Sequence, residues 1–99
     1  MRQIKKYVER IDEEIEDAKE YAERAIEEKV KGNTSDATKF KEMANDELKH
    51  ATYLHDMAVR AIQEISKVYT APVEMQEAWE KSHKEYVERV AWVKKMLEM

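Results

Sequence analysis

Two Glu-x-x-His pairs are the residues of this chain with the clearest capacity for chemistry. Glu47 and His50 occur in the stretch NDELKH, and Glu80 and His83 occur in EKSH. A spacing of three places both side chains on one face of a helix, where an oxygen and an imidazole nitrogen can reach the same ion. Mixed carboxylate and imidazole ligands suit iron or manganese, and zinc is also compatible with them. Both pairs are therefore candidate metal ligands.

The spacing alone is weak evidence, because Glu accounts for 17 of the 99 residues and often precedes a His by chance. Position in the apolar pattern is more informative. Glu14 and Glu47 each interrupt an apolar stripe, and a buried carboxylate is costly unless it is paired or binds a metal. His50 lies on the flank of the second stripe and His83 lies on the third. His55 is expected to be polar surface, and charged stretches such as EEKVK are expected to face solvent.

Three long helices must position these side chains. Apolar residues recur at intervals of three and four along most of the chain, which is typical of helices that face a core. The stretches KGNTSD and YTAPVE interrupt this pattern, and their Gly and Pro residues suit helix ends. Helices are therefore predicted over 2–31, 35–69 and 73–97. The short first connection should make the first two antiparallel, which gives a long helical hairpin plus a third helix.

Composition supports this all-α class and argues against several kinds of function. The chain has one Gly, one Pro and no Cys, and 40% of its residues are charged, so neither a disulfide framework nor a Cys-based zinc site is available. The net charge of -4 argues against nucleic acid as a main partner. No apolar run reaches the ~18 residues of a membrane span, and the N-terminus lacks a signal-peptide pattern. We expect a single domain over 1–99, in the cytoplasm, with neither nucleic-acid nor membrane partners.

The first two predicted helices resemble those of the ferritin-like superfamily, and of rubrerythrins most closely. Those proteins carry Glu-x6-Tyr on the first helix and F..E.A..E..H on the second. Glu14 and Tyr21 of this chain fit the first motif, and the stretch KFKEMANDELKH fits the second. The similarity covers about residues 11–65.

This resemblance implies a ferritin-like bundle with a di-iron carboxylate site. Glu14 and Glu47 would be its carboxylate ligands, and His50 would be its imidazole ligand. The implied activity is iron binding, or Fe(II) oxidation by O2 or peroxide. Without a cation, carboxylates brought together in this way repel each other, so at least one pKa in the cluster should be raised.

The chain also departs from the ferritin-like pattern. A full ferritin-like chain has two helices after the first pair and a second set of ligands on them, whereas only one helix is predicted here. Cys residues for a rubredoxin-like iron centre are also lacking. A homodimer or higher homo-oligomer would complete the bundle and supply the missing ligands by symmetry. Alternatively, Glu80 and His83 would join the site within one chain, which leaves it one carboxylate short.

A second class of function is a non-catalytic helical interaction module without a metal. It would bind a partner helix, or a second copy, through the apolar stripes, with six Met and two Trp as adhesive surface. A scaffolding protein with a vestigial site is a third option. The environment of Glu14, Glu47 and His50 discriminates between these classes. Exposure to solvent, or pairing with Lys and Arg alone, would favour the interaction module.

Overall fold

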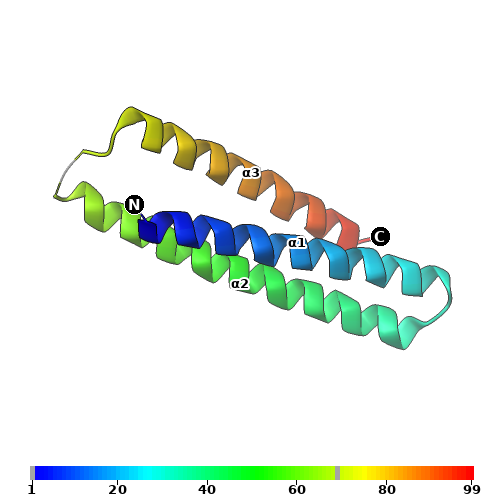
Figure 1. Cartoon of the computed structure of the whole chain (residues 1–99). Coiled ribbons are helices and arrows are strands. Elements are labelled where there is room, and N and C mark those ends of the chain that lie inside the picture. The colour runs from blue at the N-terminus through cyan, green and yellow to red at the C-terminus, as the bar shows by residue number, and fades with distance from the viewer. Residues whose placement is uncertain (1, 69) are drawn as a thin grey trace.

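The fold is an all-α arrangement of three helices, seen in a computed structural model that describes residues 2–68 and 70–99. Helix α1 spans Arg2–Val30, α2 spans Thr34–Ser66 and α3 spans Val73–Leu97 (Figure 1). No strand occurs in these described ranges, so the predicted all-α class with three helices is confirmed. The molecule is a rod of 56 × 17 × 17 Å. None of the helices in the described part of the chain has a stretch long and apolar enough to cross a bilayer.

Helices α1 and α2 form the predicted antiparallel hairpin and pack along most of their length (Figure 1). Their interface is a seam of alanines with no exposed surface: Ala18, Ala22, Ala44, Ala51 and Ala58. Small side chains let the two backbones approach closely, and larger residues fill the space on either side. On α1, Ile15 is the most deeply buried of these larger residues, at 1% exposed.

Gly32 fixes the turn between α1 and α2. Its φ of +85° lies in the left-handed region, which glycine adopts at little cost. The Gly32 N–H donates to the Lys29 carbonyl (3.1 Å), and the Asn33 N–H donates to the Glu28 carbonyl (2.9 Å). This Schellman pattern ends many helices. It stops α1 at Val30, slightly before the predicted end.

Helix α2 is shorter at its C-terminus than the sequence pattern predicts. It ends at Ser66, whereas the predicted end, Tyr69, lies outside the described residues. The Lys67 N–H donates to a carbonyl three residues earlier, a tightening that is common in a last helical turn. Helix α3 begins at Val73, where the prediction placed it. Pro72 precedes it with φ −55° and ψ 148°, and because proline has no N–H it is tolerated at a helix start but not deeper inside.

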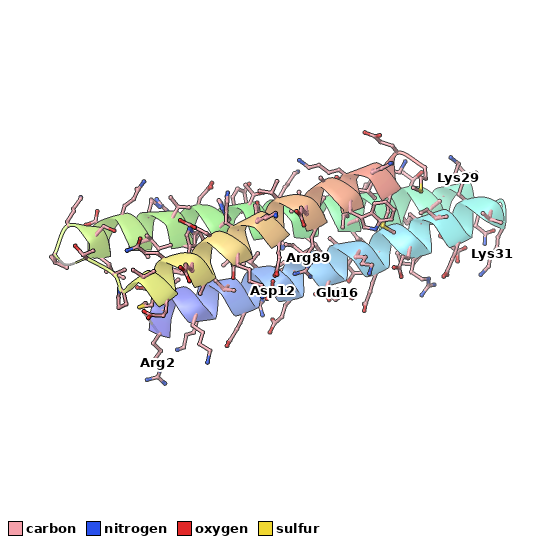
Figure 2. All side chains as sticks on the ribbon, turned by 90° about the horizontal axis from the view of Figure 1, so that it is seen from above. Arg2, Asp12, Glu16, Lys29, Lys31 and Arg89 are labelled. Atoms are coloured by element: carbon pink, nitrogen blue, oxygen red, sulfur yellow. The ribbon has the colours of Figure 1, made fainter. Side chains whose placement is uncertain are left out.

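Helix α3 lies across the hairpin and packs more sparsely, mainly against α1. Its last turns are the best anchored, since three apolar side chains are buried against the hairpin: Val93, Met96 and Leu97. Toward its N-terminus α3 diverges from α1 and α2 (Figure 1). Arg89 ties the middle of α3 to α1, because its Nη1 donates to Asp12 Oδ1 (2.8 Å) and its Nη2 lies 3.7 Å from Glu16 Oε2. Figure 2 shows these three side chains meeting between the two helices.

Candidate metal centre

Glu14, Glu47 and His50 come together on the hairpin, with Glu14 supplied by α1 and the other two by α2. One ligand atom from each residue lies within 4.8 Å of the other two. His50 Nδ1 is 3.5 Å from Glu14 Oε2 and 3.8 Å from Glu47 Oε2. The structure thus brings together three of the five residues that the sequence nominates as ligands.

The two carboxylate oxygens of Glu14 have different surroundings. The residue is 7% exposed, and its Oε1 lies 3.4 Å from Arg10 Nε. Its Oε2 is buried beside Glu47 and His50 and has no hydrogen-bond donor among the described residues. A buried oxygen without a donor costs about 1–3 kcal/mol, and more when it carries charge. A proton or a cation in the space between the three side chains would therefore stabilise this oxygen.

Glu28 shows how the same helix satisfies a carboxylate whose burial is structural. It is also 7% exposed, which corrects the expectation that the whole EEKVK stretch faces solvent. Asn33 Nδ2 donates to Glu28 Oε2 at 2.7 Å, and Lys31 Nζ lies 3.6 Å from Oε1. The hydrogen bond from Asn33, helped by the charges of Lys31 and Arg24, lowers the pKa of Glu28. The turn between α1 and α2 therefore accounts for the burial of the Glu28 carboxylate. Glu14 has no such donor for its Oε2, so its burial has no comparable explanation.

The pKa of Glu47 is raised to about 7. Its side-chain hydrogen bond with Glu14 is the largest cause, followed by burial and by repulsion from the Glu14 charge. That hydrogen bond requires a proton, because two ionised carboxylates are both acceptors. Glu47 in its protonated form could therefore act as a donor toward Glu14. The predicted rise of a pKa in this cluster is confirmed, and Glu47 is the residue that shows it.

We expect the metal-free protein to lose stability as the pH rises from about 5 to about 8. The pKa of Glu47 in the folded protein lies above its ordinary value of 4.5, so the folded state binds more protons than the unfolded state in this window. The stabilisation is fully present below about pH 4.5 and is lost as the pH passes about 7. The full difference corresponds to about 3 kcal/mol. Partial exposure of Glu47, whose side chain is 21% accessible, reduces the expected loss to about 1–2 kcal/mol.

Urea unfolding across this pH range measures the effect, with Glu47→Gln as the variant that removes the titrating group. The variant should show a flatter dependence of unfolding free energy on pH. Glu42→Gln, an exposed site on the same helix, should retain the wild-type dependence. A wild-type slope no steeper than that of Glu47→Gln would contradict the raised pKa of Glu47.

Glu80 and His83 are not brought to this cluster. The group of close ligand atoms found in residues 2–68 and 70–99 includes neither of them. Glu80 is exposed and lines a groove with Ile4 and Ile62 near the start of α3. His83 lies against a different histidine, with its Nδ1 3.0 Å from His55 Nε2.

The environment of His55 differs from the one that the sequence predicts. It is not polar surface, because its side chain is only 16% exposed and its ring stacks on Tyr86 with centroids 4.5 Å apart. The sequence contains a pattern that indicates this position of His55. Leu48 and Thr52 precede His55 by seven and three residues, a spacing that puts all three on one side of α2. That side faces α3.

Comparisons of the chain with family models, curated proteins and solved structures yield no match. The ferritin-like resemblance therefore stays a prediction. Any functional assignment depends on the geometry and chemistry of the side chains themselves.

Proposed function

We propose that this protein binds a divalent transition-metal ion through Glu14, Glu47 and His50, and that iron is its preferred ion. The main support is Glu14 Oε2, a buried oxygen with no donor among the described residues. It lies beside a second carboxyl group whose pKa is raised to about 7. Glu47 gives up its proton when a cation enters, because the cation neutralises both charges at once. Two carboxylates with one imidazole suit iron or manganese.

Each of the three residues has a distinct part in binding. Glu14 is the fixed ligand, since burial and the Arg10 ion pair hold its carboxylate in place. Glu47 exchanges a proton for the ion. His50 is 54% exposed, so it lies at the open side through which an ion reaches the two carboxylates. A bound iron ion would supply Lewis acidity and one-electron chemistry, and Fe(II) oxidation is the activity we propose for the loaded site.

We further propose that a second copy of the chain covers the cluster and completes a di-iron site. Glu14 follows Asp12 by two residues and so lies about 200° around α1, on the side away from Arg89 and α3. On this open side α2 exposes Met43 and Met57, each 40% accessible and seven residues to either side of His50. Apolar surface around a polar cluster is typical of an interface. Two-fold symmetry would then bring two sets of three ligands together.

Sedimentation at micromolar concentration tests this assembly. We expect a mass of about twice the 11.8 kDa of one chain, since an interface of this kind is isologous. Met57→Glu places a charge on the proposed interface and should shift the protein toward monomer. Val87→Glu alters a 51% exposed residue of α3 and should leave the mass unchanged. A wild-type mass near 11.8 kDa would rule out the dimer.

An anaerobic Fe(II) titration tests metal binding itself. We expect saturation near one Fe(II) per chain, with up to about one proton released per ion at a pH below the pKa of Glu47. Calorimetry in two buffers of different ionisation enthalpy measures both quantities. Admission of air then tests oxidation through the appearance of ferric absorbance. Absence of stoichiometric Fe(II) binding at micromolar protein would overturn the proposed function.

The interaction module stays the second candidate, since the apolar surface on α2 suits it equally well. The environment of Glu14, Glu47 and His50 agrees partly with a metal site and partly with an interaction module. Glu14 is buried and pairs with Arg10 through one oxygen only, whereas His50 is exposed. The module predicts no effect of metal on stability or on oligomeric state, and the titration separates the two functions.

A further inference from the structure

A second group of nitrogen donors lies where α2 and α3 meet, on the side of the hairpin that faces α3. His55 Nε2 and His83 Nδ1 are 3.0 Å apart, and neither residue belongs to the Glu14 cluster. The two rings are partly stacked, with centroids 5.0 Å apart and planes inclined by 30°. Trp79 and Tyr86 flank them, with ring centroids 5.9 Å and 4.5 Å from that of His55.

The hydrogen positions on these two rings follow from their neighbours. Asp56 Oδ1 lies 3.7 Å from His55 Nδ1, and its charge favours the tautomer with hydrogen on that nitrogen. The lone pair of His55 Nε2 then faces His83, and His83 Nδ1 donates the hydrogen between them. Because His83 is exposed, this hydrogen can move to the other ring nitrogen. Both facing nitrogens then carry a lone pair that a metal ion can accept.

We propose that His55 and His83 form a second metal site, for a borderline transition-metal dication such as Cu(II), Ni(II) or Zn(II). Imidazole is a preferred ligand of these ions. Metal–nitrogen bonds of about 2.0–2.1 Å separate two ligating nitrogens by about 2.9 Å at a right angle and by about 3.3 Å at a tetrahedral angle. The observed 3.0 Å falls within this interval, so the two nitrogens can ligate one ion without a change in their separation.

The residues around His55 and His83 support a role in metal binding. A ligating histidine commonly donates its other N–H to a carboxylate, which fixes the tautomer and strengthens the ligand. Asp56 Oδ1, 3.7 Å from His55 Nδ1, lies beyond hydrogen-bond distance and favours the same tautomer through its charge alone. No third Asp, Glu or His of the described chain joins the two nitrogens in a close group, so water would complete the coordination of the ion.

Metal at this position would join α3 to the hairpin at a point where α3 is weakly held. The backbones of α2 and α3 seldom approach each other closely, so side chains join the two helices, among them Thr52 and Tyr86, whose hydroxyls are 3.4 Å apart. A bound ion would add a coordinate link between the two helices and hold the diverging part of α3. The link is independent of the Glu14 cluster and does not rest on the proposed iron function.

Quenching of Trp79 fluorescence by Cu(II) tests the site. Trp79 lies 6.1 Å from His83, centroid to centroid, and the Trp92→Phe background makes it the only tryptophan. Cu(II) titrated at neutral pH should quench this emission saturably. His83→Phe keeps an aromatic ring in the stack but removes the nitrogen. It should raise the Cu(II) concentration needed for half-quenching by at least ~10-fold, whereas Glu47→Gln should not change it.

Each outcome of the Cu(II) titration either supports or overturns the proposed site at His55 and His83. Quenching of His83→Phe at the same Cu(II) concentration as the parent would overturn the site. Loss of quenching in Glu47→Gln would place the copper at the Glu14 cluster and would overturn it too. Far-UV circular dichroism checks that His83→Phe folds, which we expect because His83 is exposed. His83→Gln gives the same comparison with a polar side chain and should likewise raise the half-quenching concentration.

Discussion

Glu47→Gln is expected to abolish tight Fe(II) binding while leaving the metal-free protein at least as stable as wild type above the pKa of Glu47. The substitution removes one ligand and one of two repelling charges, and the Gln amide can donate to Glu14 Oε2. In the wild type, Fe(II) at one hundred times its dissociation constant should stabilise the fold by about 2.7 kcal/mol. For a chain of this size that is a rise in Tm of about 10–20 °C.

Thermal melts under argon, with and without Fe(II), measure both parts of this prediction. The Glu47→Gln protein should show almost no metal-induced shift. Glu42→Gln serves as the matched control, because it removes the same charge from an exposed position of the same helix and should keep the wild-type shift. Equal shifts in Glu47→Gln and wild type would mean that Glu47 is not a ligand and that NDELKH is only a polar turn of α2.

Ile15→Ala is expected to destabilise the fold by about 2–5 kcal/mol. Ile15 is 1% exposed and packs with Ile11 and Ala51 against Tyr86 and Val90 of α3, so truncation leaves a cavity between the helices. A loss of this size is a large part of the ~5–15 kcal/mol that stabilises a typical domain. Urea unfolding should therefore shift to much lower midpoints. If Fe(II) binds the folded state as we propose, saturating iron should restore part of the loss.

The control for this prediction is Val30→Ala. Val30 is 83% exposed, and a surface truncation of this kind usually changes stability by less than about 0.5 kcal/mol. A loss below about 1 kcal/mol for Ile15→Ala would show that α3 does not pack on the hairpin tightly enough to form a common core.

The hairpin and its carboxylate cluster could be predicted because their signals are local. Periodic apolar residues define the stripes, Gly32 and Pro72 mark their ends, and a short connection makes two helices antiparallel. Glu14 and Glu47 appear as interruptions of adjacent stripes. Once α1 and α2 pair, these interruptions must meet, so the sequence alone leads to the cluster.

Features that depend on a third element could not be predicted in the same way. The burial of Glu28 requires the side chain of Asn33, which the turn positions. The environment of His55 requires the angle at which α3 crosses the hairpin, and no periodicity within a single helix specifies an angle between helices. The same angle decides that His83 meets His55 and not the Glu14 cluster.

The alanine seam has a consequence for which ion the proposed metal site would prefer. Packed helix axes lie about 8–10 Å apart, depending on the side chains between them, and a seam of alanines such as that between α1 and α2 favours the short end of this range. Glu14 and Glu47 stand on opposite sides of that seam, so the alanines determine the width available to an ion. Coordination tolerates only about ±0.2 Å in its bond lengths. Preference among ions of different radius should therefore respond to Ala18→Ser or Ala51→Ser, substitutions that leave each ligand in place.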